Sequence, residues 1–493
     1  MADRVPVNPF PLPEGPVGAR FPTADLDGAV ANRLRGACPD LSLDDVARDA
    51  AARDWWPLTM LWAREGTVPA RPGAVARPTS ASEVAALLAV CDHERVPVTP
   101  AGGRSGVCGA AVPIYGGVSL DLTAMSGIVD VDDESLLVDV LPGTWGDSFE
   151  SELRDRYGLT LGHWPQSIAL STVGGWIACR SAGQYSNRYG KIEDMVVGLE
   201  VALADGSVIS TGGTAPRAAT GPDLGQLFVG SEGTLGVITR SRLRAHPVPD
   251  GEARAAYAFD TFAAGLDTCR RILRRGATPA VLRLYDPRES RRSFDVDGNV
   301  LVVLDEGDPR LVEATLAVVD EAATANAARR EDAGLVERWL THRNDVSGLA
   351  QAVSRDVVVD TCEVAGRWSA LAPLYERVVA AVKAVPGAWV CSAHQSHAYA
   401  DGACLYFTFA GQRDDPDGFY VDAWNAVTSA TIEAGCAISH HHGIGLNRSR
   451  FVRRALGSSF DTLVRVKQAL DPHGILNPGK LALPSPFGPD VAW

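Results

Sequence analysis

A glycine-rich loop at residues 98–109 constrains this chain most strongly. It reads Val-Thr-Pro-Ala-Gly-Gly-Arg-Ser-Gly-Val-Cys-Gly and follows an apolar helical pattern over residues 84–90 and a short strand pattern over residues 96–98. Glycine reaches positive φ and lets the backbone approach closely, so such a loop can present several N–H groups to one anion. The loop therefore predicts a pyrophosphate site, and a tight structural turn is the alternative.

The net charge and the hydropathy pattern limit the classes of protein to which this chain can belong. The 493 residues carry a formal net charge of −14, which argues against nonspecific nucleic-acid binding. No apolar run reaches the roughly 18 residues of a membrane span, and the first residues lack the apolar segment of a signal peptide. The nine cysteines are scattered without a C-x-x-C pair, as in proteins with reduced cysteines. We therefore expect a cytoplasmic protein.

Changes in composition along the chain predict four segments. Residues 1–66 form a proline-rich lead-in followed by helices, and residues 67–249 alternate short strands, helices and glycine-rich loops. Residues 250–435 alternate strands with longer helices, which is typical of an α/β domain. Residues 436–493 contain a run of three histidines and a final helix. The strand–helix–strand pattern before the glycine loop favours an α+β nucleotide-binding unit.

Five motifs in a fixed order carry a family resemblance. Pro-x-Gly-Gly-x-Ser-Gly begins at Pro100, Ser-Thr-Val-Gly-Gly-Trp at Ser171, and Tyr-Gly-Lys-Ile-Glu-Asp at Tyr189. Gly-Ser-Glu-Gly-Thr-Leu-Gly-Val-Ile-Thr begins at Gly230, and Asp-Pro-x-Gly-Ile-Leu-Asn-Pro-Gly-Lys begins at Asp471. In this order the motifs resemble the FAD-dependent vanillyl-alcohol-oxidase superfamily, whose FAD-binding domain is of the PCMH type.

Within that superfamily the chain looks most like the alkylglycerone-phosphate synthases (alkyl-dihydroxyacetone-phosphate synthases), over residues 45–481. Two segments carry this likeness: Ser-His-His-His-Gly-Ile-Gly at 439–445 and Ala-Cys-Leu-Tyr-Phe at 403–407. D-lactate and glycolate dehydrogenases usually have Glu-His-Gly-Ile-Gly where this chain has His-His-Gly-Ile-Gly. The likeness implies a two-subdomain PCMH-type FAD-binding domain over 67–249, an α/β cap over 250–435, and a C-terminal segment that returns to the FAD domain.

The same likeness implies which residues contact FAD. The pyrophosphate would lie in the first loop, the isoalloxazine and ribityl parts against two middle segments, and the adenine side against the fourth motif. The implied cofactor-binding residues are Pro100, Ala101, Gly102, Gly103, Arg104, Ser105, Gly106, Gln166, Ser167, Ser171, Thr172, Cys179, Arg180, Ser181, Ala182, Glu232, Gly233, Thr234, Leu235, Gly236, Val237 and Ile238. Arg104 replaces the usual third glycine of the loop and adds charge toward a phosphate, and Gln166 stands where an aspartate is usual. The first loop has no histidine and Cys179 is displaced from the place where relatives attach the cofactor, so we expect noncovalent FAD.

Tyr406 lies in an apolar strand pattern, and its match in the synthases implies a proton acceptor beside the flavin. A core tyrosine with a bonded hydroxyl is the alternative. A tyrosine with a pKa of about 10 is a poor base at neutral pH, so nearby cations would have to lower that pKa. His440, His441 and His442 can supply such an environment. On a strand His440 and His442 would share a face. We favour contacts to flavin and substrate over a surface run, and we expect no metal.

Two arginines and a further histidine are implied near the substrate. Arg283 lies in an apolar strand, where a charge needs a partner. By resemblance it organises the active site, and an ion pair with Asp286 or another acid is the alternative. Arg343 matches an arginine that holds the substrate phosphate, although its planar fork would bind a carboxylate equally well and its distance from Glu363 is longer than in the synthases. His397 reaches the cavity or packs elsewhere.

The resemblance implies an FAD-dependent transferase of ether lipid biosynthesis. In such an enzyme Tyr406 deprotonates an acylated ketone phosphate beside flavin N5, and an alcohol replaces the acyl group through a flavin adduct. The alternative is an FAD-dependent dehydrogenase or oxidase of a D-2-hydroxy acid or of a specialised metabolite. A non-enzymatic flavin carrier is a third reading, in which the cap has no role. We expect a small-molecule substrate, either a phosphorylated ketone or a 2-hydroxy acid, and we leave open a peripheral membrane contact and a homodimer.

Overall fold

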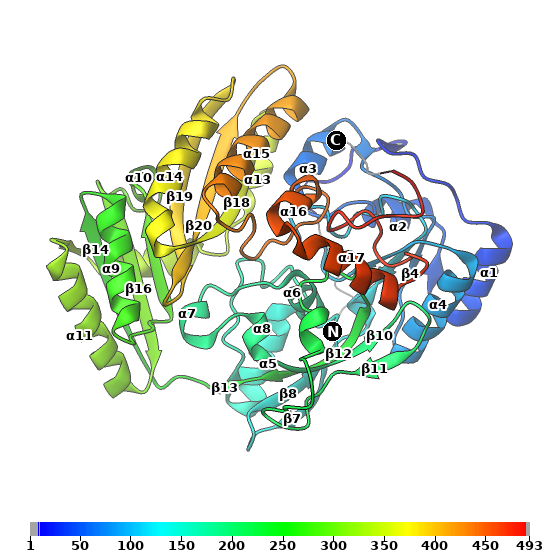
Figure 1. The fold of residues 1–493 in the computed structure, drawn as a ribbon, viewed down its shortest axis with the longest axis horizontal. Coiled ribbons are helices and arrows are strands. Elements are labelled where there is room, and N and C mark those ends of the chain that lie inside the picture. Colours follow the sequence, from blue (N-terminus) through cyan, green and yellow to red (C-terminus); the bar gives the residue numbers. More distant parts are fainter. Residues whose placement is uncertain (1–7, 9, 490–493) are drawn as a thin grey trace.

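The computed structural model describes residue 8 and residues 10–489 (Figure 1). Its larger sheets form two lobes. The first lobe contains a four-stranded sheet in the order β2-β4-β6-β5 and a five-stranded sheet in the order β11-β10-β12-β8-β7. The second, which we call the cap, contains one seven-stranded sheet in the order β17-β14-β16-β15-β19-β20-β18. The predicted α+β class, with two subdomains in the first lobe and an α/β cap, is confirmed.

The bounds of the elements show where each lobe begins and ends. The first lobe contains β1 (Gly18–Ala19), α1 (Gly28–Ala37), β2 (Leu41–Ser42), α2 (Asp45–Ala50), α3 (Pro57–Arg64), β3 (Thr67–Val68), β4 (Ala74–Ala76), α4 (Ala81–Glu94), β5 (Val98–Ala101), β6 (Val118–Asp121), β7 (Ile128–Asp132), β8 (Leu137–Val140), α5 (Gly146–Tyr157), β9 (Leu159–Thr160), α6 (Val173–Cys179), α7 (Ser186–Tyr189), α8 (Ile192–Met195), β10 (Val196–Ala202), β11 (Val208–Ser210), β12 (Val237–Arg244) and β13 (His246–Pro247). The cap contains β14 (Gly251–Phe259), α9 (Phe262–Arg274), β15 (Val281–Tyr285), α10 (Pro287–Phe294), β16 (Asn299–Gly307), α11 (Pro309–Ala325), β17 (Arg329–Glu331), α12 (Gly334–His342), α13 (Ser347–Val353), β18 (Val358–Arg367), α14 (Trp368–Lys383), β19 (Ala388–Ala398), β20 (Gly402–Gly411) and α15 (Pro416–Glu433). Two helices follow, α16 (Ser449–Leu456) and α17 (Ser459–Leu470).

The predicted strand–helix–strand unit, β4–α4–β5, leads directly into the glycine-rich loop. Ser80 caps α4 by accepting a hydrogen bond from the backbone N–H of Glu83, and the helix ends at Arg95 in the left-handed region. The chain then enters β5, which pairs in parallel with β6 so that Val98 lies opposite Val118. The loop leaves the end of β5, at the edge where a strand-to-loop junction can hold a phosphate. Residues 1–66, expected as a lead-in followed by helices, also contain β2, which pairs with β4.

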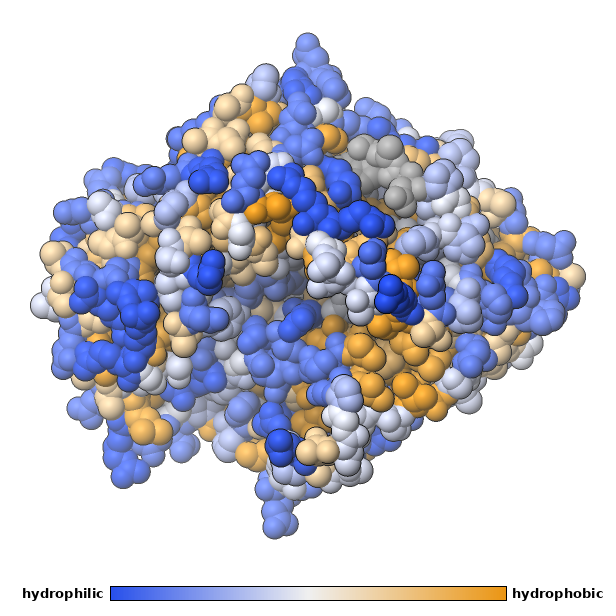
Figure 2. All heavy atoms as spheres, in the orientation of Figure 1, coloured by the Kyte–Doolittle hydropathy of each residue, from blue (hydrophilic) through white to orange (hydrophobic). Residues whose placement is uncertain are grey.

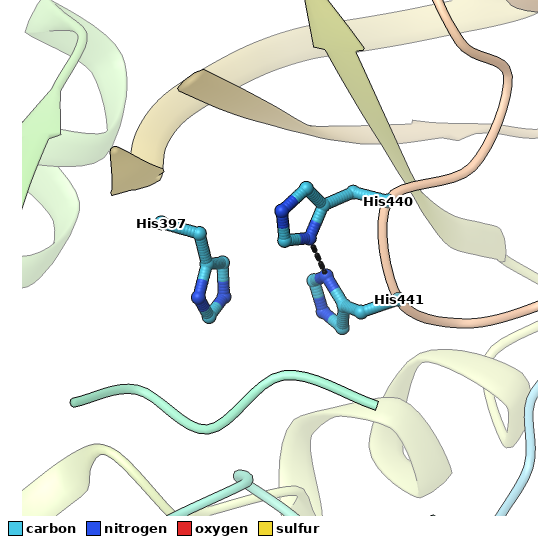
Figure 3. A group of neighbouring side chains, drawn as sticks. All are labelled: His397, His440 and His441. Atoms are coloured by element: carbon cyan, nitrogen blue, oxygen red, sulfur yellow. Dashed lines mark hydrogen bonds between the residues drawn. The ribbon is translucent and has the colours of Figure 1, made fainter. Parts of the chain in front are cut away.

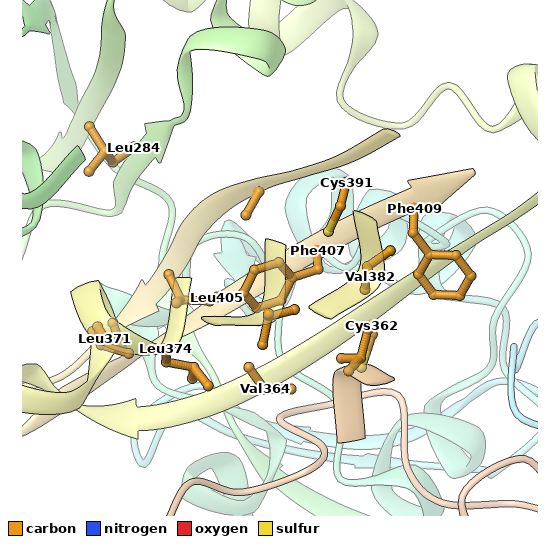
Figure 4. Close-up of a cluster of buried hydrophobic side chains, with 14 of the residues drawn as sticks. Leu284, Cys362, Val364, Leu371, Leu374, Val382, Cys391, Leu405, Phe407 and Phe409 are labelled. Atoms are coloured by element: carbon orange, nitrogen blue, oxygen red, sulfur yellow. The ribbon is translucent and has the colours of Figure 1, made fainter. Parts of the chain in front are cut away.

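Side chains along the cap strands alternate between the hydrophobic core on one face of the sheet and the cavity on the other. In β20, Phe407 and Phe409 are fully buried among side chains of α14 and neighbouring strands, such as Leu374 (Figure 4). Successive strand residues point to opposite faces, so the opposite face presents Tyr406 and Thr408. The sheet is antiparallel throughout. Its apolar face packs against the helices, and its other face carries the polar side chains that line the cavity.

The C-terminal segment returns to the first lobe, as the resemblance implies, and α17 lies against that lobe (Figure 1). The backbone N–H of Asn477 donates to the carbonyl of Val98 at 2.7 Å, directly before the glycine-rich loop. The buried Lys467 ammonium donates to the carbonyls of Thr234 and Leu476, each at 2.7 Å. These bonds tie the chain end to β5 and to the segment that precedes β12.

No helix in the described part of the chain combines the length and apolar character needed to cross a bilayer. The face drawn in Figure 2 is largely hydrophilic, with hydrophobic residues in smaller groups.

Candidate active site

A cavity of about 990 Å³ lies between the first lobe and the cap, and it gathers most of the residues implied by the sequence. Those that line it are Pro100, Ala101, Gly102, Gly103, Arg104, Ser105, Gly106, Gln166, Ser167, Ser171, Thr172, Cys179, Ser181, Ala182, Glu232, Gly233, Gly236, Val237, Ile238, Arg283, Arg343, His397, Tyr406, His441 and His442. Four implied residues are not among the lining residues: Arg180, Thr234, Leu235 and His440. The volume is at the upper end of the range for ligand pockets, about 300–1,000 Å³.

The glycine-rich loop is pressed against the second hydroxyl-rich segment. A Cβ at Gly102 would lie 2.1 Å from Thr172 Oγ1, and a Cβ at Gly103 would lie 2.2 Å from the carbonyl oxygen of Leu170. Only glycine fits at both positions. Thr172 Oγ1 is buried and has no hydrogen-bond partner among the described residues, although it borders the cavity. Close backbone approach and an unpaired hydroxyl suit a dinucleotide cofactor that lies along this loop.

Two implied cofactor residues direct their charges elsewhere. The guanidinium of Arg104 does not add charge toward the loop, because it pairs with Asp121 at 3.1 Å and bonds Ser119 Oγ at 3.1 Å. Glu232 turns its carboxylate to the C-terminal segment, where it accepts from the N–H groups of Ile444 at 2.5 Å and Gly445 at 2.8 Å. Both residues border the cavity, and their side chains hold the structure around it.

The remaining off-cavity positions have structural partners. Arg180 adopts the left-handed conformation that ends α6, and its largely exposed side chain pairs with Glu193 at 3.2 Å. Leu235 is buried in the core of the first lobe. The Thr234 hydroxyl donates to the carbonyl of Ser231 at 2.7 Å.

Tyr406 faces the cavity, but its surroundings do not lower its pKa. Its hydroxyl donates to Thr361 Oγ1 at 3.0 Å, and its ring stacks on His394 with centroids 4.8 Å apart. Burial raises the pKa of the phenol, Glu363 raises it further, and Arg283 opposes the shift only weakly. The expectation that nearby cations depress this pKa is therefore not met.

The histidine run lies in a loop of bends rather than on a strand, so the expected sharing of one strand face by His440 and His442 was wrong. One carboxylate shapes this loop. Glu363 Oε1 accepts from the backbone N–H groups of His440 at 3.1 Å, His441 at 3.1 Å and His442 at 2.8 Å. Three successive N–H groups directed at one oxygen form an anion-binding concavity, and the carboxylate of Glu363 occupies it.

Glu363 is also charge-paired. The fully buried Arg448 guanidinium binds both of its oxygens, and His442 Nδ1 lies 3.0 Å from Oε2. Burial opposes ionisation of Glu363, but Arg448 and His442 together hold its pKa well below the usual range. Burial lowers the pKa of His440 to about 4 and also lowers that of His441, so both rings are neutral near pH 7.

Arg283 is partnered through a histidine rather than by Asp286. Its Nη2 lies 2.6 Å from His394 Nε2, and His394 Nδ1 lies 2.8 Å from Glu289 Oε2. Asp286 instead caps α10 and accepts from the N–H of Ala393. Arg283 Nε is buried and has no hydrogen-bond partner among the described residues. Arg283 therefore retains unused donor capacity at the cavity wall.

Three more arginines line the cap side of the cavity. Arg343 bonds Gln184 Oε1 at 3.3 Å and lies over the rings of Trp164, Tyr185 and Trp339. Arg338 donates to a backbone carbonyl at 2.8 Å, and Arg292 lies 3.6 Å from Glu289. In the described part of the chain, Arg283, Arg338 and Arg343 form no ion pair with a carboxylate. The cap residues that line the cavity also include Glu289, Asp345 and Asp360, so the four arginines outnumber the carboxyl groups of this wall by one.

His397 sits in a strained position that places it in the cavity wall. Its φ of 49° lies in the left-handed region, at an irregularity of the β19–β20 pairing between Ser396 and Ala398. Bulges of this kind re-aim a side chain next to active sites. Its Nδ1 lies 2.7 Å from Ser186 Oγ, and its ring stacks on His440 with centroids 4.9 Å apart.

Several site residues were not identified from the sequence. Glu363 and His394 are buried polar residues inside apolar strand patterns, which was the available signal, whereas Glu289 lies in the polar helix α10 and had none. Asp54, just before α3, had no signal beyond its charge. Its buried carboxyl borders the cavity, and burial raises its pKa to about 7.

Comparison with known proteins agrees with this architecture. Residues 72–212 match the FAD binding domain family, and residues 248–481 match the C-terminal domain of FAD linked oxidases. The chain is 31% identical over 431 residues to the uncharacterized FAD-linked oxidoreductase YgcU of Escherichia coli K12, covering 83% of this chain and 89% of that protein. It is 29% identical over 459 residues to alkyldihydroxyacetonephosphate synthase of Dictyostelium discoideum, covering 85% and 74% of the two chains.

Other relatives have other activities. The glycolate oxidase subunit GlcD of Bacillus subtilis is 27% identical over 431 residues, covering 83% of this chain and 89% of that protein. A solved alkyldihydroxyacetonephosphate synthase superposes with a TM-score of 0.79 at 25% identity, covering 96% of this chain and 90% of that chain. The cofactor is FAD, and the chain belongs to the FAD-linked oxidoreductases of the PCMH-type vanillyl-alcohol-oxidase superfamily.

Proposed function

We propose that this enzyme acts on a small anionic substrate by removing a proton from it beside the flavin, in a reaction like that of the alkylglycerone-phosphate synthases. The observation that carries the proposal is the cap wall, where Arg283, Arg338 and Arg343 face the same cavity as Tyr406 without a carboxylate partner among the described residues. The whole chain has a net charge of −14, so this local positive excess is directed at a ligand. A phosphate or a carboxylate fits the forked guanidinium groups.

The residues divide the work by position. Bound FAD supplies an electron-deficient ring that draws electrons from the substrate. Tyr406 takes part in the proton transfer, with Thr361 Oγ1 holding its hydroxyl in place. Arg283 is the nearby cation that favours the phenolate, and its free Nε can bind an anionic oxygen of the substrate. Arg343 binds the phosphate or carboxylate of the substrate, at the end away from the reacting carbon.

Tyr406→Phe is expected to lower turnover by at least about 10²-fold while FAD stays bound, because it removes the hydroxyl that would take the proton and keeps the ring. Tyr257→Phe is the matched control, since Tyr257 is a buried tyrosine that bonds Asp320 on the far side of the cap sheet. Turnover and flavin absorbance would be measured on both variants. Near-normal turnover of Tyr406→Phe would remove this residue from the mechanism.

We also propose that FAD is bound without a covalent link. Burial raises the pKa of the Cys179 thiol, which lines the cavity, to about 12, so it stays protonated and is a weak nucleophile. Acid precipitation of the holoprotein is expected to release all flavin absorbance into the supernatant. Colour that stays with the pellet would contradict the proposal.

One observation favours a second candidate function. A guanidinium fork binds a carboxylate as well as a phosphate, and a relative of this chain is a glycolate oxidase subunit. The alternative is therefore a D-2-hydroxy-acid dehydrogenase or oxidase. Anaerobic mixing with candidate substrates separates the two. Bleaching of the flavin by an acylated ketone phosphate, reversed by a long-chain alcohol, supports the transferase. Bleaching by D-lactate or glycolate alone supports the dehydrogenase.

A further inference from the structure

A line of hydrogen bonds leads from the cavity to the edge of the cap. His441 lines the cavity, and its Nδ1 lies 2.8 Å from Nδ1 of His440 (Figure 3). His440 does not line the cavity. Its other nitrogen, Nε2, lies 2.6 Å from the hydroxyl of Tyr399. The three side chains thus form a continuous series in which both nitrogens of His440 are used.

Tyr399 is the outer end of this series. It follows β19 directly, is only partly buried, and is followed by the exposed residues Ala400 and Asp401. The ammonium of Lys191 lies 4.8 Å from the centre of its ring. The series therefore connects a cavity-lining imidazole, which is itself partly buried, to a tyrosine that precedes exposed residues.

The charge states suit proton transfer. Burial is the largest influence on both rings and keeps His440 and His441 neutral at pH 7, and the charged side chains of Glu363, Lys191 and Arg448 act on them more weakly. A neutral imidazole has one donor and one acceptor nitrogen, so it can take a proton on one side and release another from the opposite side.

We propose that His441, His440 and Tyr399 form a proton relay that carries the proton released in the cavity to solvent. A proton binds at His441 Nε2 while the Nδ1 proton moves to His440 Nδ1. The Nε2 proton of His440 then moves to the oxygen of Tyr399, and the original hydroxyl proton of Tyr399 leaves to water. One proton enters, one leaves, and every group ends neutral, so no oxidant or reductant is needed.

The same histidines suit a metal less well. Ligand atoms of His397, His440 and His441 lie within 4.8 Å of one another. However, the rings of His397 and His440 are stacked at an interplanar angle of 21°. The lone pairs of imidazole lie in the ring plane, so those of two stacked rings run side by side rather than toward a shared ion.

The relay rests on the proposed function in one respect, namely that the reaction releases a proton into the cavity. A first test needs no substrate. In holoprotein labelled with ¹⁵N-histidine, we expect a scalar coupling across the Nδ1–H···Nδ1 bond between His440 and His441, and a shift of the His440 Nε2 resonance in Tyr399→Phe. A missing coupling, or an unmoved Nε2 resonance, would overturn the relay even if no substrate had been found.

A second test follows the proton itself. Flavin bleaching and proton release, read with a pH-indicator dye in weak buffer, are expected to coincide in the native enzyme. In Tyr399→Phe, proton release should lag behind bleaching by about tenfold or more, and added imidazole should restore it. Tyr257→Phe should show neither effect. Coincident signals in Tyr399→Phe would overturn the proposal, whereas an absence of bleaching with every substrate would count against the proposed function instead.

Discussion

Glu363→Ala is expected to lower the free energy of unfolding by about 3–5 kcal/mol and to reduce turnover on the order of 10²-fold or more. The substitution leaves the fully buried Arg448 without its carboxylate partner, and an uncompensated buried charge is costly. It also removes the acceptor shared by the backbone N–H groups of His440, His441 and His442. The loop that presents His441 to the cavity would then lose its shape.

Urea titration and turnover measurements test this expectation. Glu337→Ala is the matched control, because Glu337 pairs with Arg254 on the cap surface and its side chain is 63% exposed. Such an exposed pair is worth no more than about 1 kcal/mol. Glu363→Gln should fall between the two, since it keeps an acceptor for the N–H groups but loses the charge that balances Arg448. Equal behaviour of Glu363→Ala and the Glu337 control would show that another group shapes the loop.

Gly103→Ala should weaken FAD binding by roughly 5- to 150-fold, which corresponds to an overpacking cost of about 1–3 kcal/mol. The added Cβ would lie 2.2 Å from the carbonyl oxygen of Leu170 and 2.8 Å from the ring of Trp145. A backbone carbonyl cannot turn away as a flexible side chain can, so the two loop segments must separate. That separation displaces the N–H groups that would hold the pyrophosphate.

Gly36→Ala is the control for this variant. Gly36 lies in α1, and a Cβ there would meet nothing within 4 Å. It should leave FAD affinity unchanged and slightly stabilise the helix, because alanine is the better helix former. Binding would be measured by titrating apoprotein with FAD and following flavin fluorescence. Native affinity in Gly103→Ala would show that the loop has more room than its contacts indicate.

The local chemistry of the site could be predicted from the sequence where residues close together in the chain do the work. The glycines of the loop at 98–109 indicate that another group approaches the backbone closely. The alternation of side chains along β20 places Tyr406 and Phe407 on opposite faces of the sheet. The prediction that the histidine run alternates between two strand faces was wrong, because Glu363 accepts three successive N–H groups on one oxygen and the loop bends around it. That carboxylate comes from β18, far away in sequence.

The order and spacing of the motifs by themselves determined the family and the cofactor, and they predict the loop that would hold its pyrophosphate, because these features depend on backbone conformations that glycine and hydroxyl residues specify locally. Only the tertiary structure decided which charges neutralise one another. Arg104 pairs with Asp121 and Arg448 with Glu363, whereas Arg283 bonds the imidazole of His394, which carries no negative charge. Burial among these partners sets the pKa values of the site, and burial is a property of the packed lobes rather than of any segment.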